Sequence, residues 1–366
     1  MQKKLLSVAV AGALALPASA MAVEVFGTID TGIRSASKVV TATGDDSLVS
    51  VTEGARTTNR WGFRGSEDLG GGLMANYWFE GQYASDSGGG PGSSAGGANQ
   101  GIFQRKNLVG LSKGGMSIDL GRDYTVNFKT QGIYDPMSYT YTGITPSAGT
   151  NVSGTRSSNL VTAGFRFGTG GIRVDYAMGE VAGDNGSGTR MGLNGDFAFG
   201  PVTVAAAYST LSFDAGGATG DVTTDNMNIG FAWKLGAFTF RGGYSTTEYS
   251  TDANSDVADT PMVLLGVQYA FSPTLNGRVG FYDTKYNVGG TEVGSRDLAI
   301  IALDYYLSKR TTLYVAFDRH GIEGTTVSVS GNTGAITLGT AGQAAVLGAN
   351  SNDGATGFSV GIAHSF

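Results

Sequence analysis

The chain of 366 residues has no cysteine. An exported protein of this size without cysteine has to hold together without disulfides. Charged residues make up 15% of the chain, against about 25% in an average soluble domain. No stretch beyond residue 22 approaches the ~18 uninterrupted apolar residues that a transmembrane helix needs. These deficits exclude a disulfide-stapled scaffold and a bundle of membrane helices.

The start of the chain has the features of a secretory signal peptide. Two lysines precede an apolar run from Leu5 to Leu16, and small residues suited to cleavage follow the run. The run is too short to cross a membrane, although an uncleaved anchor helix is the alternative. We therefore expect residues 1–22 to be removed and residues 23–366 to form the mature protein.

Glycine and aromatic residues are abundant, with 60 Gly, 16 Tyr and 18 Phe, and the formal net charge is −6. The negative charge argues against nucleic acid as a partner. Many segments of about ten residues alternate apolar with small or polar side chains, which is typical of amphipathic strands. The clearest are VTVAAAY from Val202, NMNIGFAW from Asn226, FTFRGGY from Phe238 and MVLLGVQYAF from Met262.

Tight turns and long polar loops alternate along the chain. A soluble sandwich or propeller also has alternating strands, but it has no consistent order of long and short connections. Strict alternation fits an outer-membrane barrel, with short periplasmic turns and long external loops. We predict an all-β, 16-stranded antiparallel transmembrane β-barrel with eight long loops and seven short turns. The turns lie near 68–72, 112–115, 168–171, 200–201, 236–237, 272–274 and 307–310.

Strand parity assigns side chains to the lipid or the lumen, because residues i and i+2 share a face. Trp61 and Phe63 are expected to face lipid, which turns Arg60 and Arg64 inward. The same reasoning places further charged and polar side chains in the lumen. These are Glu80, Arg105, Asn107, Arg156, Arg166, Arg173 and Asp175, whereas Lys106 is expected to face outward.

The connection at about 124–155 is too long for a plain hairpin. Folded into the barrel, this constriction loop would narrow the pore and set its acid, Asp135, opposite the arginines. Several bases facing one acid predict a preference for anions. Each arginine taken alone is better explained by a solvated charge or a structural ion pair, and the prediction depends on several of them converging on one side of the lumen.

Other chemistries have weaker support in the sequence. Asp252, Asn254 and Asp256 have the spacing that opens a calcium loop, but Val257 and Val263 stand where that loop needs Gly and Glu. An acidic solvated loop explains them better, so a metal site there is a weak possibility. His364 and Ser365 are neighbours on a strand and face opposite sides, which is no catalytic dyad. We expect no enzyme activity and no cofactor.

Four segments together resemble the general-diffusion trimeric porins of Gram-negative bacteria, in the branch found in Neisseria, Bordetella and Burkholderia relatives. The segments are NRWGFRGSEDLGGGLMANYWFE at 59–80, RKNLVGLSKGGMSIDLGRDY at 105–124, YYLSKRTTLYV at 305–315 and VGIAHSF at 360–366. The resemblance implies a homotrimer packed through the first and last strands and an inward third loop. It also implies a basic wall of Arg60, Arg64 and Arg105 with Arg156 nearby, Glu80 in the same lumen and Asp135 on the loop.

The resemblance further implies that the terminal Phe366 is the aromatic residue by which the barrel-insertion machinery selects its substrates. The surroundings would then be outer-membrane lipid and lipopolysaccharide. The predicted function is a water-filled channel for passive diffusion of small hydrophilic solutes, with mild anion selectivity. A substrate-specific channel for organic anions and a surface adhesin or receptor barrel are the alternatives.

Overall fold

The computed structural model describes residues 23–89, 101–141, 144–146, 155–184, 186–214, 221–251, 254–324, 327–331, 334–338, 344–346, 349–351 and 353–366. The expected signal peptide, residues 1–22, lies outside the described residues. So do Asp252 and the side chains of Asn254 and Asp256, which have the calcium-loop spacing.

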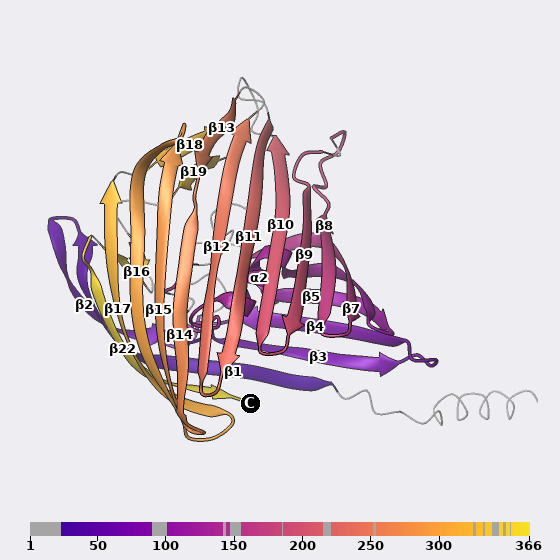
Figure 1. Ribbon diagram of the computed structural model, residues 1–366, viewed down its shortest axis with the longest axis horizontal. Coiled ribbons are helices and arrows are strands. Elements are labelled where there is room, and N and C mark those ends of the chain that lie inside the picture. The colour runs from indigo at the N-terminus through magenta and orange to yellow at the C-terminus, as the bar shows by residue number, and fades with distance from the viewer. Residues whose placement is uncertain are drawn as a thin grey trace, which may run out of the picture.

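The described chain forms a closed, 16-stranded antiparallel barrel, as predicted (Figure 1). Each strand pairs with the next along the chain, and the barrel closes where the first strand, β1, pairs with the last, β22. The first half contains β1 (Glu24–Thr41), β2 (Gly44–Glu53), β3 (Arg60–Asp68), β4 (Met74–Gln82), β5 (Lys106–Lys113), β6 (Met116–Tyr124), β7 (Arg156–Phe167), β8 (Gly170–Ala177) and β9 (Arg190–Phe199). The second half contains β10 (Val202–Asp214), β11 (Asp221–Leu235), β12 (Phe238–Thr251), β13 (Asn254–Asp259), β14 (Met262–Ser272), β15 (Leu275–Val288), β16 (Thr291–Tyr306), β17 (Thr311–Gly324) and β22 (Thr356–Ser365). These eighteen segments make sixteen wall strands, because β2 with β3 and β13 with β14 each form one strand that is interrupted once.

The predicted tight turns lie between consecutive strands from β3–β4 to β16–β17, as expected. The external connections are less loop-like than expected. Two of the eight long connections expected from the sequence, 38–53 and 287–293, are mostly strand: the first lies largely in β1 and β2, and the second is interrupted only at residues 289–290. Polar residues in these stretches extend the β-strand pairing beyond the apolar, lipid-facing part of the wall. β18 (Val327–Gly331) and β19 (Gly334–Leu338) pair in a separate two-stranded sheet. β20 (Ala344–Val346) pairs with β21 (Ala349–Ser351), which joins the main sheet by pairing with β1.

The second strand of the wall is interrupted between β2 and β3. Gly54 adopts φ +76°, which favours glycine, and residues 54–59 turn into the lumen. The turn brings Nε of Arg56 within 2.8 Å of a carboxylate oxygen of Asp304 on β16. The carbonyl of Arg56 accepts a hydrogen bond of 2.6 Å from the backbone N–H of Tyr141 in the constriction loop. This inward turn and the loop are therefore joined inside the barrel.

Exposure alternates along the strands as the two faces require. On β14, Leu265 is 51% exposed on the outer face, whereas its neighbour Leu264 is fully buried on the inner face. Trp61 and Phe63 lie with Phe79 on the outer face, but the ring of Phe103 covers them, with its centroid 5.8 Å from that of Trp61. Part of the loop before β5 thus returns along the outside of the wall.

The predicted orientation of β5 is wrong by one residue. Asn107 pairs with the outward Phe79, and Lys106 pairs with the inward Glu80. Lys106 therefore faces the lumen, where its Nζ lies 3.1 Å from a carboxylate oxygen of Asp123. The segment NLVGL has apolar residues on both parities, so the sequence pattern alone does not fix its register.

The constriction loop begins with a short helix, α2 (Val126–Tyr134), which Figure 1 shows inside the barrel. Thr125 is its N-cap, and the Thr125 hydroxyl accepts a hydrogen bond from the N–H of Phe128. Among the described residues, no helix is long and apolar enough to cross a membrane. The helix is too short to be stable alone, and hydrogen bonds to the barrel wall stabilise it.

The inner face of the barrel carries an apolar core that the sequence pattern did not predict. Tyr134, Met137 and Tyr141 of the loop pack against buried side chains of the last strands. The side chains of the lumen wall were expected to be small or polar, but in this sector they are apolar because they pack against the loop. The wall residues of the cluster are Met262, Leu264, Tyr282, Leu298, Ile300, Ala302, Tyr314 and Ala316.

Candidate functional site

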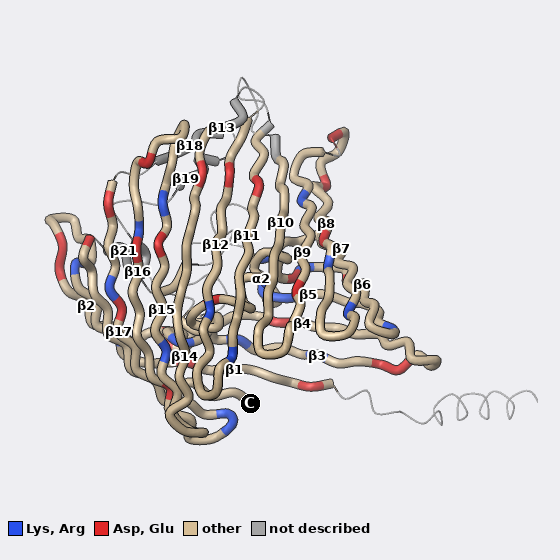
Figure 2. Tube along the Cα trace, in the orientation of Figure 1, with Lys and Arg blue, Asp and Glu red and all other residues tan. Residues whose placement is uncertain are grey.

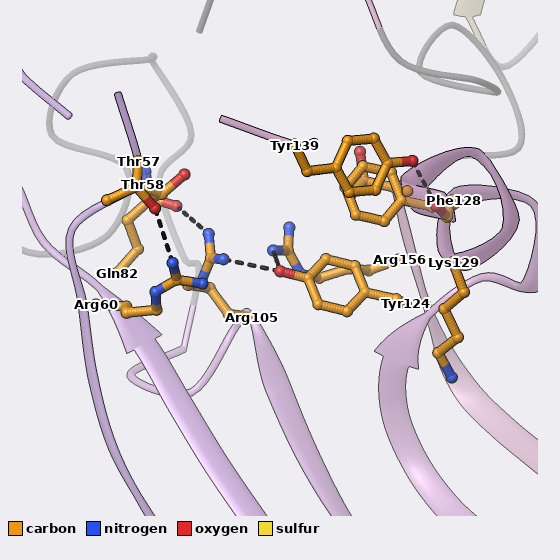
Figure 3. A pocket seen from close by; sticks show the side chains of 12 residues that line it. Thr57, Thr58, Arg60, Gln82, Arg105, Tyr124, Phe128, Lys129, Tyr139 and Arg156 are labelled. Atoms are coloured by element: carbon orange, nitrogen blue, oxygen red, sulfur yellow. Dashed lines mark hydrogen bonds between the residues drawn. The ribbon is translucent and has the colours of Figure 1, made fainter. Parts of the chain in front are cut away.

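A cavity of about 590 Å³ lies between the constriction loop and the strands β3–β7 (Figure 3). Four basic side chains line the cavity: Arg60 at the start of β3, Arg105 just before β5, Arg156 at the start of β7 and Lys129 on α2. Figure 2 shows basic segments gathered where α2 approaches β5 and its neighbours. The structure thus brings together three of the predicted arginines and one lysine of the loop.

Arg105 is buried and held on several sides. Its Nε lies 2.6 Å from a carboxylate oxygen of Glu80, which is also buried. Its two terminal nitrogens donate to Gln82 at 3.2 Å and to the hydroxyl of Tyr124 at 2.8 Å. Such a network fixes the guanidinium at one place in the cavity wall. Glu80 faces inward as predicted.

Arg156 and Arg60 have a different environment. Arg156 donates to the same Tyr124 hydroxyl at 2.7 Å, and its guanidinium lies 4.3 Å from the centroid of the Tyr124 ring. Arg60 donates to the hydroxyl of Thr57 at 2.8 Å. Within the described part of the chain, neither arginine has a carboxylate within salt-bridge distance. Both therefore present uncompensated positive charge to the cavity.

Lys129 reaches the cavity from α2, and its Nζ lies 2.8 Å from a carboxylate oxygen of Asp123. The other oxygen of Asp123 lies 3.1 Å from Lys106. One carboxylate is therefore shared between two lysines. This arrangement leaves the region around the cavity with more positive than negative charge.

Asp135 was expected to face the arginines, but its side chain points elsewhere. It is fully buried at the C-terminal end of α2 and accepts hydrogen bonds of 2.8 Å from the hydroxyl of Tyr282 and 2.9 Å from the N–H of Tyr139. Its carboxylate binds the loop to β15. Burial raises the pKa of Asp135 to about 6. The loop therefore contributes no acid to this part of the cavity wall.

Arg64 lies on the inner face, as predicted, but it does not join the other arginines. Its terminal nitrogen lies 2.6 Å from a carboxylate oxygen of Glu24, in a pair that is about half exposed near the periplasmic rim. Its guanidinium also lies 4.9 Å from the ring centroids of Phe26 and Trp78. Arg64 lies nearer the rim than Arg60 does, because β3 runs from the cavity toward the periplasmic turn.

The further lumen charges have structural partners. Arg166 and Arg173 face inward and lie 2.8 Å and 3.6 Å from carboxylate oxygens of Asp196. Asp175 is fully buried, and a carboxylate oxygen accepts a hydrogen bond of 3.0 Å from the N–H of Val126 at the start of α2. These residues hold the wall and the loop rather than line the cavity.

Sequence reasoning missed the aromatic part of the site. Tyr124, Phe128 and Tyr139 line the cavity together, with stacked rings. The tyrosines of the loop were visible in the sequence, but their direction depended on how the loop folds. Among the described residues, no cluster of three or more metal-ligating side chains occurs. His320 is buried against Asp318, with 3.1 Å between Nε2 and a carboxylate oxygen.

Comparison with known proteins agrees with this architecture. Residues 7–325 match the family model described as Gram-negative porin. Outer membrane porin protein 32 of Delftia acidovorans is 29% identical over 398 residues, covering 100% of both chains. An outer membrane porin protein of Bordetella pertussis is 27% identical over 380 residues, covering 86% of this chain and 93% of the relative.

Among solved structures, the anion-selective porin from Comamonas acidovorans superposes with a TM-score of 0.77 at 24% identity, covering 94% of this chain and 99% of that chain. At this level of sequence identity, the similarity to the Comamonas acidovorans structure shows that the two chains share a fold. The family match extends over most of the sequence and agrees with the closed barrel, its inward loop and its polar cavity. The chain therefore belongs to the Gram-negative porin family and is an outer-membrane diffusion channel.

Proposed function

We propose that this channel admits small hydrophilic solutes by passive diffusion and prefers anions. The observation that carries the proposal is the uncompensated charge of Arg60 and Arg156 in the cavity beside the constriction loop. Asp135, the acid expected to oppose them, is bound to the wall instead. The electrostatic potential in the pore is therefore positive, so it repels cations and attracts anions.

The size of such an effect depends on the surroundings of the charges. Two unit charges 4 Å apart interact by about 1 kcal/mol in bulk water and by about 4 kcal/mol at the effective dielectric constant of ~20 near a protein surface. A narrow lumen with protein walls lies closer to the second case, and salt screens it. A moderate, salt-dependent anion preference is therefore expected.

One protein of similar fold supports the same preference for anions. The Comamonas acidovorans protein, whose fold this chain shares, is described as anion-selective. The net charge of −6 does not oppose the proposal, because selectivity depends on the charges that line the narrow region.

Planar-bilayer measurements in a potassium chloride gradient test the proposal. The wild-type reversal potential should indicate permeability for chloride over potassium. Arg60→Ser and Arg156→Ser should each move it toward cation preference. Arg64→Ser is the matched control, because Arg64 is paired with Glu24 away from the cavity. An unchanged potential in both cavity variants would refute the role of these arginines.

The two alternative functions give different results in the same experiment. A channel specific for one organic anion should show current that micromolar amounts of that anion block. An adhesin or receptor barrel without a transport role should show no conductance. Ohmic conductance for simple salts supports general diffusion and argues against both an adhesin and an enzyme.

We further propose that three copies assemble through the outer faces of the first and last strands. These faces carry exposed apolar side chains, including Ile29 and Ile33 on β1 and Val360 and Ile362 on β22. Phe366 is 53% exposed at the end of the chain, where its backbone pairs with Gly27, and we propose it as the signal for the barrel-insertion machinery. Lipopolysaccharide would cover the remaining outer face. The mass of the detergent-solubilised protein tests the trimer, and insertion efficiency of Phe366→Ala tests the signal.

A further inference from the structure

The cavity beside the constriction loop has two unlike walls (Figure 3). On one side lie the guanidinium groups of Arg60 and Arg105, and on the other the loop presents the rings of Phe128 and Tyr139. Both ring residues are partly exposed. An anion preference explains the guanidinium side but gives the aromatic side no role.

The aromatic side is an ordered stack. The ring centroids of Tyr124 and Phe128 are 4.8 Å apart with an interplanar angle of 11°. Those of Phe128 and Tyr139 are 4.2 Å apart at 22°. Arg156 also lies over the ring of Tyr124, with its guanidinium carbon 4.3 Å from the ring centroid. Stacking of this kind restricts the rings to one orientation at the wall of the cavity.

The loop backbone supports this placement at some conformational cost. Ser138 and Tyr139 adopt φ +57° and +52°, which is uncommon for residues other than glycine. The N–H of Tyr139 donates to Asp135 at 2.9 Å, and its hydroxyl donates to the carbonyl of Phe128. The ring is thus fixed at the surface of the cavity, whereas Tyr134 and Tyr141 of the same loop are fully buried in the core.

We propose that the constriction selects planar aromatic carboxylates among organic anions, an inference that rests on the anion preference proposed above. The carboxylate would bind the guanidinium groups, for which Arg60 is free of a carboxylate partner among the described residues. The ring would lie against Phe128 and Tyr139. An aliphatic carboxylate of equal charge satisfies the guanidinium side alone, whereas an aromatic one satisfies both.

Benzoate and cyclohexanecarboxylate provide the test, because they have the same charge and number of carbons and differ in aromaticity. Each is added to single channels that conduct chloride, and the concentration for half-maximal block is measured. We expect benzoate to block at a concentration about 2- to 10-fold lower. Equal concentrations for the two solutes would overturn the inference.

Phe128→Leu keeps an apolar side chain but removes the ring, so it should abolish the difference between the two solutes. Tyr139→Leu provides a second variant in case the first fails to assemble. Phe165→Leu is the matched control, since Phe165 is 43% exposed on the outer face of β7. A preference for benzoate that survives in an assembled Phe128→Leu or Tyr139→Leu channel would contradict the assignment.

The chloride-to-potassium permeability ratio, measured in the same membranes, separates this inference from the proposed function. A ratio that favours chloride with equal block by the two carboxylates contradicts aromatic selection alone. A ratio without chloride preference contradicts the proposed anion channel, whatever the block.

Discussion

Asp135 accepts a hydrogen bond of 2.8 Å from the hydroxyl of Tyr282, so the acid of the constriction loop points at the barrel wall. The charge of Asp135 is buried away from the solute path, and its removal should not make the pore more anion-selective. We expect Asp135→Asn to leave the reversal potential close to that of the wild type. A shift as large as that of Arg60→Ser would contradict the buried position.

The same carboxyl makes loop docking depend on pH. Burial raises the pKa of Asp135 from its ordinary 3.8 to about 6, so the docked state binds the proton more strongly than the undocked state. The stabilisation is fully present below pH 3.8 and is lost as the pH rises through about 6. Current noise from loop motion should therefore increase between about pH 4 and pH 7. Asp135→Asn, which does not titrate, should show no such increase.

Two glycines on the inner wall make room for the loop. A Cβ on Gly230 would lie 2.2 Å from the ring of Tyr134, and one on Gly243 would lie 2.5 Å from the same ring. Gly230→Ala should displace Tyr134, weaken loop docking by about 1–3 kcal/mol and raise conductance or its variance. Single-channel recording measures both. Gly195→Ala is the control, because its Cβ would have no neighbour nearer than 3.8 Å.

The seam where the barrel closes contains a buried ion pair. Both terminal nitrogens of Arg34 donate to Asp318 at 2.8 Å, and one also donates to Ser359 at 2.9 Å. Arg34→Met takes the arginine cation away from the buried carboxylate, which then keeps its contact with His320, and this should cost about 3–5 kcal/mol of stability. Arg34→Met combined with Asp318→Leu should recover much of that loss. The temperature at which gel mobility changes from folded to unfolded measures the effect, and equal values for the two variants would count against the pair.

Arg105 and Arg60 should both affect selectivity, but only Arg105 acts through a paired acid. Arg105→Ser lowers the charge of the lumen by one and leaves the carboxylate of Glu80, paired with Arg105 at 2.6 Å, without its cation. Arg60→Ser lowers the charge by one and frees no acid. We expect the reversal potential of each variant to move toward cation preference. The double variant Arg105→Ser with Glu80→Gln leaves the net charge of the lumen unchanged and should return the potential to about the wild-type value, and a failure to do so would mean that Glu80 does not face the solute path.

The sequence predicted the features that depend on local alternation. The barrel, its tight turns and the inward direction of Arg60 and Arg156 follow from side-chain parity on well-patterned strands. The direction of β5 did not follow, because NLVGL is apolar on both faces and its register is fixed by the pairing of Asn107 with Phe79. A local pattern decides orientation only where one of its faces is clearly polar.

The direction of Asp135 depended on contacts distant in sequence. Its partner Tyr282 lies 147 residues along the chain. The inner wall around Leu264 and Ile300 is apolar because the loop packs there. A rule that places apolar residues toward lipid and polar residues toward water does not predict an apolar inner wall. The aromatic stack depends on the left-handed backbone at Ser138 and Tyr139, which no residue type in that segment signals.

The contact between Arg56 and Asp304 has a mechanical consequence. A closed sheet around water bends most easily by flattening from a circular to an oval cross-section. The inward turn at residues 54–59, the hydrogen bond from Tyr141 to Arg56 and the anchored loop form a brace between β3 and β16. Such a brace opposes flattening at the level of the constriction loop. The width of the lumen there should therefore stay nearly constant when the lateral pressure in the surrounding membrane changes.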